Sequence, residues 1–314
     1  MGNMLAVTGA TGKSGRVFIE YLCKNSNRIN EMFPGGIRIL SHHRSGDIIP
    51  DGIFATVEEV SGNLEDTDYL ASSLSEVDTL VHIAGIHWSR EVADAAAKCK
   101  VRRMICVHTT GIYSKYKAAG EEYRHIDEYV CDVCERSGIV LNILRPTMIY
   151  GCCSDRNVVT FIKMVDKLPI MPVVNGARYE LQPVHYADLG KAYYDVLTRE
   201  ESVTLRENHD GCELIRGKDY VLSGGEVLML RDMLLRIGEL MGKRVKFISV
   251  PYPIAITGAV CVYGITFGKV DLREKVQRLC EPRAYAHDAA SADFGYAPRT
   301  FRDGVVDEVS EYRG

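Results

Sequence analysis

Short apolar runs alternate with helical patterns through the first half of the chain. Continuous apolar runs bounded by turn residues are typical of strands buried on both faces of a sheet. Helices between such strands are typical of crossovers, so the pattern predicts an α/β fold with a doubly wound parallel sheet. The predicted strands are Met4–Val7, Ile37–Leu40, Thr79–Ile83, Met104–Val107 and Val140–Leu144, and the predicted helices between them are Ser14–Lys24, Asp66–Ser75, Ser89–Lys98 and Glu121–Ser137.

The pattern changes after about residue 151. Helices are predicted over Val158–Lys167, Tyr186–Thr198 and Leu228–Met241, with a short strand at Tyr220–Ser223. This half of the chain does not repeat the first half. We therefore predict one domain over residues 1–150 and a smaller C-terminal lobe over residues 151–314, which also returns elements to the first domain.

Composition narrows the class of protein. The chain has 314 residues, of which 46% are hydrophobic and 25% charged, as expected for a globular protein. Its net charge of -4 gives no reason to expect a nucleic-acid partner. No signal-peptide pattern precedes the first strand, and the ten cysteines are scattered, so we expect a cytoplasmic protein with reduced thiols. Cys131 and Cys134 fall inside a predicted helix without a second pair, so we expect them to pack, and we predict no metal site.

One apolar stretch raises the question of a membrane. Residues Ile254 to Phe267 are uncharged and are interrupted by Gly258 and Gly264. About 20 residues are needed to span a bilayer, and this stretch is shorter. We expect no transmembrane span but a buried or surface-docking helix, and peripheral membrane contact stays open.

A glycine-rich turn follows the first predicted strand. Gly9, Gly12 and Gly15 are spaced three residues apart and lead into a helix that begins near Lys13. A tight turn, a backbone without Cβ and the free N–H groups of a helix N-terminus together suit a pyrophosphate, which predicts a dinucleotide ligand. A nucleoside-triphosphate loop would need glycine at Val7, so that motif is excluded. A glycine turn without a ligand stays an alternative.

Four motifs, in order, resemble one protein family. Thr8–Gly15 resembles the TGxxGxxG fingerprint of short-chain dehydrogenases/reductases, and Val77–Gly85 resembles a fourth-strand motif of their extended branch, the NAD(P)-dependent epimerases and dehydratases. Leu144–Gly151 and Gln182–Leu189 resemble two later motifs of that branch. The resemblance implies a Rossmann-like domain with a smaller C-terminal lobe that covers the substrate.

The resemblance also implies roles for individual residues. The glycine turn would hold the pyrophosphate, and Asn63 with Leu64 would contact the adenine. Ala84 and Gly85 would lie beside the nicotinamide ribose, and Pro146, Thr147 and Met148 would flank the nicotinamide. The cofactor-binding residues implied in this way are Gly9, Thr11, Gly12, Lys13, Ser14, Gly15, Asn63, Leu64, Ala84, Gly85, Pro146, Thr147 and Met148.

The end of the second predicted strand bears on the choice between NAD and NADP. An acidic residue there would bind the ribose 2′-hydroxyl, whereas a basic residue would accommodate a 2′-phosphate. No acid occurs before Asp47, and Arg44 can bind a phosphate through two parallel hydrogen bonds. We therefore expect NADP in preference to NAD, with Arg44 as the discriminating residue.

The catalytic position departs from the family pattern. The family combines a Ser or Thr with a Tyr and, four residues later, a Lys that lowers the pKa of the phenol. The resemblance places Thr109 as the hydroxyl and Tyr123 as the phenol, but Asp127 stands where the lysine belongs, and a negative charge there would raise the pKa of the phenol. A register one turn earlier puts Tyr123 at the lysine position and Ala119 at the tyrosine position, again without a lysine.

Other positive residues could supply the missing charge in space, and the candidates are Lys115, Lys117, Arg124 and His125. The literal Tyr-x-x-x-Lys at Tyr113–Lys117 starts on the loop after the fifth strand, so we interpret it as a coincidence.

Two functions remain open at this point. The first is an NAD(P)-dependent epimerase, dehydratase or reductase for a sugar nucleotide or a similar carbonyl or alcohol substrate. Gln182 and His185 would then face the cleft, and Arg283 would bind a substrate diphosphate. Asp188, Arg103 and Arg145 are expected to be structural. The second is a dinucleotide-binding sensor or scaffold protein with impaired catalysis. The chain is expected to be a monomer or a homodimer.

Overall fold

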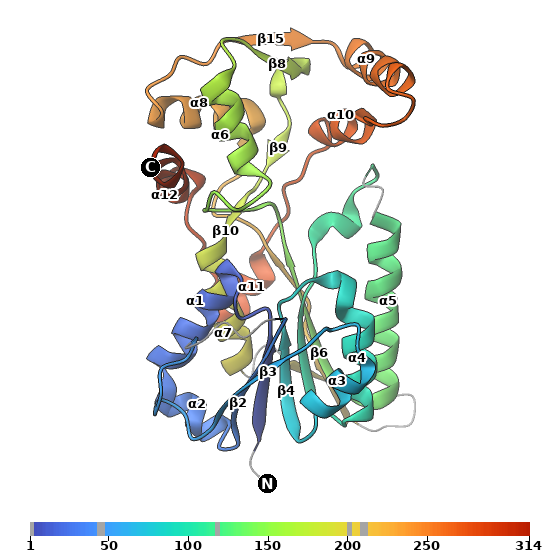
Figure 1. Cartoon of the computed structure of the whole chain (residues 1–314), viewed down its shortest axis with the longest axis vertical. Helices are drawn as coiled ribbons and strands as arrows, with labels where there is room; N and C mark the ends of the chain where they lie inside the picture. Colours follow the sequence, from blue (N-terminus) through green and yellow to red (C-terminus); the bar gives the residue numbers. More distant parts are fainter. Residues whose placement is uncertain (1–2, 43–47, 117–119, 200–202, 208–212) are drawn as a thin grey trace.

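The computed structural model describes residues 3–42, 48–116, 120–199, 203–207 and 213–314 (Figure 1). Arg44, Lys117 and Ala119 of the sequence analysis lie outside these residues.

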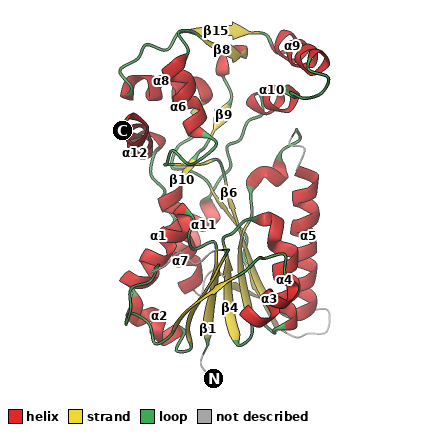
Figure 2. Ribbon diagram, viewed as in Figure 1, coloured by secondary structure: helices red, strands yellow, loops and turns green. Residues whose placement is uncertain are grey.

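A seven-stranded parallel sheet forms the centre of the larger domain (Figure 2). The strand order is β3-β2-β1-β4-β5-β6-β13, so the chain starts in the middle and builds outward in both directions. The order reverses between β1 and β4, and ligands in such sheets bind beyond the carboxyl ends of the strands at this point. The strands are β1 (Met4–Thr8), β2 (Gly36–Ser41), β3 (Val57–Ser61), β4 (Val77–His82), β5 (Arg103–Val107), β6 (Val140–Pro146) and β13 (Tyr220–Leu222).

Helices cover both faces of this sheet, and the pleat of β1 divides its side chains between them. Leu5 and Val7 belong to the core cluster beneath one helical layer, whereas Ala6 belongs to the cluster beneath the other. Both clusters are buried, so the sheet has no solvent-exposed face at its centre. One layer contains α1 (Lys13–Lys24), α2 (Ser26–Met32), α7 (Tyr186–Thr198) and α11 (Asp288–Phe294), and the other contains α3 (Thr67–Ser73), α4 (Ser89–Lys98) and α5 (Gly120–Ser137).

The smaller lobe lies beyond the carboxyl ends of the strands (Figure 1). Its own apolar core lies between three helices, α6 (Val158–Lys167), α8 (Leu230–Leu240) and α12 (Phe301–Arg313). Two more helices, α9 (Tyr252–Ile265) and α10 (Arg273–Leu279), lie at its outer side. Its short strands are β7 (Ile149–Tyr150), β8 (Met171–Val174), β9 (Glu180–Leu181), β10 (Val184–His185), β14 (Leu228–Met229) and β15 (Phe247–Val250), and the hairpin of β11 (Val203–Glu207) and β12 (Glu213–Gly217) precedes β13.

The second half of the chain returns to the first domain at several places. Helix α7 packs along α1, and β13 extends the sheet beyond β6. Asp188 of α7 binds the guanidinium of Arg299 at 3.0 Å and so ties this helix to the segment before α12. The Gly151 N–H donates to Glu308 of α12 at 2.8 Å. The lobe is therefore fixed to the sheet by several separate segments.

The hydrophobic pattern does not predict α2 and β3 in the first half of the chain, nor α10, α11, α12 and most of the short strands in the second half. The predicted helix over Leu228–Met241 begins two residues later, because Leu228 and Met229 pair with β9. The helix predicted over the apolar stretch is present as α9, but it is not buried: among its residues only Ala259 is shielded from solvent.

Candidate functional site

The glycine turn after β1 brings three elements into contact. Gly9 has φ of +74°, and a Cβ there would lie 2.6 Å from the backbone nitrogen of Ala84 at the end of β4. A Cβ on Gly15 would lie 2.1 Å from the carbonyl oxygen of Gly9. Both glycines are therefore required by close packing of the turn, the strand and α1.

Gly12 differs from these two glycines. A Cβ there would meet only the carbonyl oxygen of Gly9, at 3.4 Å, so its remaining surroundings are open. Gly12 is also the N-cap of α1, where the first N–H groups of the helix have no intrahelical partner. The open position and the positive end of the helix dipole together can hold the pyrophosphate of a dinucleotide.

A groove of about 650 Å³ runs from this turn across the ends of the neighbouring strands. Gly12, Ser41 at the end of β2 and Asn63 after β3 mark its course. Its size and its extension over three strand ends suit the adenosine half of a dinucleotide. The predicted cofactor residues that line it are Gly9, Thr11, Gly12, Ser14, Asn63, Leu64 and Ala84.

Buried hydrogen bonds set the position of the groove beside β4. The Nδ1 atom of His82 lies 2.7 Å from the Thr8 hydroxyl, and its Nε2 atom lies 3.1 Å from the carbonyl oxygen of Gly85. Burial, reinforced by the charge of nearby His108, lowers the pKa of His82 to about 4. The neutral ring can therefore donate to Gly85 and accept from Thr8, which couples the ends of β1 and β4.

A second cavity, of about 240 Å³, lies between the sheet and the C-terminal lobe. Thr109 follows β5, and its hydroxyl accepts a hydrogen bond from the Gly111 N–H at 3.0 Å. Thr147 and Met148 follow β6 and line the same cavity. On the side of the lobe the cavity is lined by Leu181, Gln182, Arg278, Arg283 and Tyr285.

Two arginines concentrate positive charge in this cavity. The Nε atoms of Arg278 and Arg283 are both buried and have no hydrogen-bond partner among the described residues. Burial, followed by repulsion from Arg278, lowers the pKa of Arg283 to about 10, so its guanidinium stays charged at neutral pH. Arg278 also forms a 3.8 Å ion pair with Glu274. An anionic group in the cavity would supply acceptors for both Nε atoms and relieve their repulsion.

The lobe also closes onto the loop after β5. Glu281 accepts hydrogen bonds from the Ser114 hydroxyl at 2.6 Å and from the Lys115 N–H at 2.8 Å. The ring of Tyr285 packs against Tyr113 of the same loop, with centroids 5.4 Å apart. These contacts hold the two arginines opposite Thr109.

Tyr123 lies near this cavity but does not line it or the groove. Its ring packs edge-on against His87, with centroids 5.3 Å apart. Burial and then the charge of Glu122 raise the pKa of the phenol, while Arg278 acts in the opposite direction. The positive group that the described structure brings near Tyr123 is therefore Arg278 of the lobe, which the sequence analysis did not single out.

Asp127 has a different role from the one expected of it. Its carboxylate lies 2.7 Å from Nδ1 of His108 and 2.7 Å from the guanidinium of Arg145, and it is not among the groups that raise the pKa of Tyr123. Burial opposes ionisation of Asp127, but the hydrogen bond from His108 and the charge of Arg145 outweigh it and lower the pKa. Asp127 thus holds β5, β6 and α5 together.

The same network contains a serine, a histidine and an aspartate in line. Nε2 of His108 lies 3.2 Å from the hydroxyl of Ser89. A relay of this kind can activate a nucleophile, but Ser89 is fully buried and cannot meet a substrate. We therefore interpret Ser89, His108 and Asp127 as a structural network.

Several predicted residues line neither cavity. Lys13 is exposed, Gly15 and Gly85 serve the packing described above, and Pro146 accepts a hydrogen bond from Thr110 at 3.1 Å. His185 was expected to face the cleft, but it is buried and caps α7 by accepting from the Ala187 N–H at 3.2 Å.

Of the alternative cations, Lys115 donates its backbone N–H to Glu281, Arg124 donates to the Ile112 carbonyl and His125 faces two exposed glutamates. Within the described residues no group of His, Cys, Asp and Glu is arranged to hold a metal ion.

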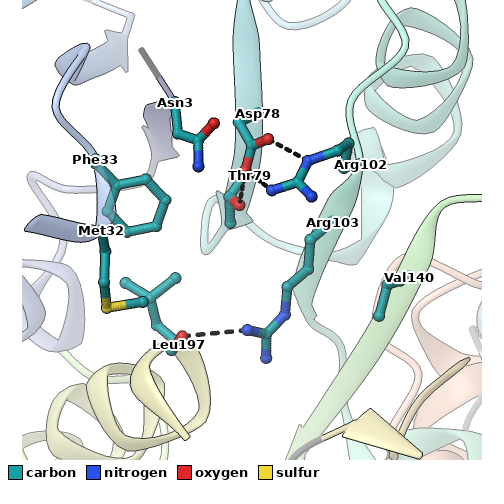
Figure 3. Close-up of a pocket in the computed structure, with 9 residues that line it drawn as sticks. All are labelled: Asn3, Met32, Phe33, Asp78, Thr79, Arg102, Arg103, Val140 and Leu197. Atoms are coloured by element: carbon teal, nitrogen blue, oxygen red, sulfur yellow. Dashed lines mark hydrogen bonds and ion pairs between the residues drawn. The ribbon is translucent and has the colours of Figure 1, made fainter. Parts of the chain in front are cut away.

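A third cavity, of about 290 Å³, opens at the amino ends of the strands (Figure 3). Two arginines reach toward it, but Arg102 pairs with Asp78 and Arg103 donates to the carbonyl of Leu197 at 3.1 Å, as drawn in Figure 3. Arg103 thereby binds the C-terminal end of α7, where exposed carbonyls favour a cation. This agrees with the structural role expected of Arg103, and the cavity lies at the opposite edge of the sheet from the groove.

No protein-family profile matches the chain, and no curated protein sequence is significantly similar to it. Among solved structures, a dTDP-glucose 4,6-dehydratase of Streptomyces venezuelae determined with NAD is 17% identical, with a TM-score of 0.67 over 98% of this chain and 96% of that one. A UDP-glucose 4-epimerase of Thermotoga maritima determined with UDP-glucose is 13% identical, with a TM-score of 0.66 over 99% and 98%.

An NADPH-dependent quinone oxidoreductase of Escherichia coli determined with NADPH is 18% identical, with a TM-score of 0.67 over 99% of this chain and 100% of that one. Because these similarities extend over the whole chain at low identity, they show a common fold. The Rossmann-like fold with a C-terminal lobe that the four motifs imply is thus confirmed.

The Asp127 network predicts a large stability effect. Asp127→Ala would leave His108 and Arg145 buried without their shared carboxylate and should lower the free energy of unfolding by about 3 kcal/mol, measured by urea denaturation. Asp132→Ala, at an exposed position of the same helix, is the matched control and should change it by less than about 0.5 kcal/mol. Equal effects of the two substitutions would contradict the structural role of Asp127.

Proposed function

We propose that the chain is a nicotinamide-dinucleotide-dependent oxidoreductase, of the epimerase, dehydratase or reductase type, that acts on an anionic substrate such as a sugar nucleotide. The observation that carries the proposal is the pair of buried, unpartnered Nε atoms of Arg278 and Arg283, which share a cavity with Thr109. The groove at Gly12 gives independent support for the dinucleotide. The similar structures are a dehydratase determined with NAD, an epimerase and a reductase determined with NADPH, in keeping with this assignment.

Residues that line the cavity, together with the nearby Tyr123, would divide the work of the reaction. A bound nicotinamide dinucleotide supplies hydride chemistry. The arginine pair would fix the anionic part of the substrate, and the Thr109 hydroxyl would orient the reacting carbonyl or alcohol. Tyr123 would hold or accept the proton, assisted by the nearby charge of Arg278. Closure of the lobe through Glu281 would then bring the substrate and the catalytic groups together.

We further propose that NADP is preferred to NAD. Ser41 lines the groove at the end of β2, and its hydroxyl donates to Glu59 of the adjacent strand at 3.0 Å. This carboxylate would repel a 2′-phosphate, so the proposal rests on Arg44, the basic residue three positions after Ser41 in the sequence.

Titration with NADPH and NADH tests this preference. The protein should bind NADPH more tightly, and Arg44→Ala should weaken NADPH binding roughly tenfold or more while changing NADH binding much less. Nicotinamide fluorescence and the ligand-induced shift in melting temperature both report the binding. Equal losses for the two dinucleotides would contradict the role of Arg44, and binding of neither would contradict the oxidoreductase proposal.

The anion site is tested separately with UDP-glucose as the probe. Arg283→Gln and Arg278→Gln should each weaken UDP-glucose binding roughly tenfold or more in calorimetry, because each removes a charge-assisted contact to the diphosphate. NADPH binding should be unchanged. Arg273→Gln, on the same helix α10 but outside the cavity, is the matched control. Unchanged affinity in both cavity variants would show that the arginines do not bind this substrate class.

The alternative function is a dinucleotide sensor or scaffold. It is favoured because position 127 carries a structural carboxylate in place of the family's lysine. It is also favoured by the raised pKa of Tyr123, because a phenol that stays protonated is a poor proton acceptor at neutral pH.

Tyr123→Phe distinguishes the two functions. In an enzyme it should lower kcat by about 10²–10⁴-fold while NADPH and UDP-glucose binding persist. Turnover is followed by nicotinamide absorbance with benzoquinone, and by chromatography of the products with UDP-glucose and dTDP-glucose, because epimerases and dehydratases return the hydride to the sugar and consume no net dinucleotide. Tyr129→Phe, at an exposed position of the same helix, is the control and should keep full activity. Tight NADPH binding without turnover of any trial substrate by the wild-type protein would favour the sensor.

A further inference from the structure

The outer side of the C-terminal lobe exposes an apolar surface. It consists of α9 and the turn that follows it, and the chain has no charged residue from Phe247 to Gly268. Ile265 and Phe267 are 77% and 93% exposed, and Ile254 and Val260 are 63% and 50% exposed. Side chains of this kind rarely gather on the surface of a protein without a binding role. We call these four residues, together with α9 and the turn that follows it, the α9 surface.

The α9 surface lies apart from the site described above. Figures 1 and 2 show α9 at the outer end of the lobe, on the opposite side from the N-terminus and the sheet. Its nearest helical neighbour is α10, which it contacts. The surface is therefore free to meet a partner while the groove and the second cavity remain accessible.

Basic residues flank the apolar segment in the sequence. Lys246 and Lys269 stand at the two ends of the uncharged segment. Between residues 243 and 278 there are seven basic residues and two acidic ones, in a chain whose net charge is -4. Lys243, Arg273 and Arg278 are paired with carboxylates, and Arg278 belongs to the second cavity, whereas Lys246 and Lys269 are exposed. The segment is therefore basic although the whole chain is acidic, and its charge favours an anionic partner.

The form of the helix indicates what kind of partner this is. Apolar residues surround α9 on all sides, so no single stripe is set aside for the groove of another protein. With 14 residues it is about 21 Å long, which is less than the hydrocarbon thickness of a bilayer. No helix within the described residues is long and apolar enough to cross a membrane. A short apolar segment of this length that is not buried suits insertion into the interface of a bilayer without crossing it.

A second copy of the chain is a poorer partner for this surface. Symmetric dimers place the same surface of each subunit against the other. Such a dimer through α9 would bring the two sets of basic residues together, and like charges at an interface are unfavourable. An anionic bilayer satisfies both the apolar residues and the flanking basic residues.

We propose that the α9 surface is a peripheral docking site for membranes that contain anionic lipids. Ile265 and Phe267 enter the apolar part of the interface, and Lys246 and Lys269 contact anionic headgroups. This proposal does not depend on the proposed catalytic function, because none of these residues lines the groove or the second cavity.

Vesicle sedimentation tests the proposal with the full chain. The protein should sediment with vesicles of phosphatidylcholine and phosphatidylglycerol, and much less with phosphatidylcholine alone. Ile265→Ser/Phe267→Ser should weaken binding roughly tenfold or more, because each side chain removed from water contributes about that factor. Lys246→Glu/Lys269→Glu should also weaken binding to anionic vesicles roughly tenfold or more, in a salt-dependent manner.

Two control variants match these substitutions. Val57→Ser/Val227→Ser removes exposed apolar side chains elsewhere, and Lys24→Glu/Lys98→Glu reverses exposed charges on the larger domain; neither should change binding. The proposal fails if the wild-type protein does not sediment with anionic vesicles, or if the α9 variants bind as their controls do. It also fails if the protein forms a dimer that Ile265→Ser/Phe267→Ser abolishes, because a second copy would then cover α9.

Discussion

The close approach of the turn after β1 to the end of β4 is the constraint on which the site depends. Gly9 leaves no room for a side chain against the Ala84 backbone, and Gly15 leaves none against Gly9 itself. The buried Thr8–His82–Gly85 hydrogen bonds hold the same junction from the side of β4. These contacts fix the start of α1, and the open position at Gly12 therefore faces the groove. The three glycines therefore serve two purposes: Gly9 and Gly15 allow close packing, and Gly12 leaves room for a ligand.

The positive charge near Tyr123 comes from the C-terminal lobe and not from α5, the helix that carries Tyr123. A lysine at position 127 would place an ammonium group beside Arg145 and His108, because the side chain at this position points into their buried network. The carboxylate of Asp127 is thus fixed by packing and cannot be read as a substituted catalytic residue. The positive charge near the phenol comes instead from Arg278, across the cleft. The hydrogen bonds of Glu281 hold this part of the lobe against the loop after β5. Catalysis and lobe closure are consequently coupled in the proposed function.

The parts of the fold that could be predicted from the sequence are those with a strong local signal. Buried strands such as β1 and β5 are continuous apolar runs, and the glycine turn has a fixed spacing. The edge strand β3 was missed because its sequence, Val-Glu-Glu-Val-Ser, is half exposed and polar, which periodicity cannot distinguish from a loop. Arg278 was missed for a different reason, since it reaches the site only through the docking of the lobe, and contacts between distant segments leave no local pattern. Arg283 was accessible to prediction because a family expectation, rather than its own surroundings, pointed to that segment.

Helix α10 joins the two surfaces that the lobe presents. It begins a few residues after Phe267, contacts α9 and carries Arg278 into the second cavity near its other end. About two turns of helix therefore separate the α9 surface from one of the two arginines that would bind the substrate anion in the proposed function. The Glu281 contact follows directly and fixes the same segment to the sheet. In the two proposals, membrane attachment and substrate binding therefore use different residues on two helices that are in contact, α9 and α10.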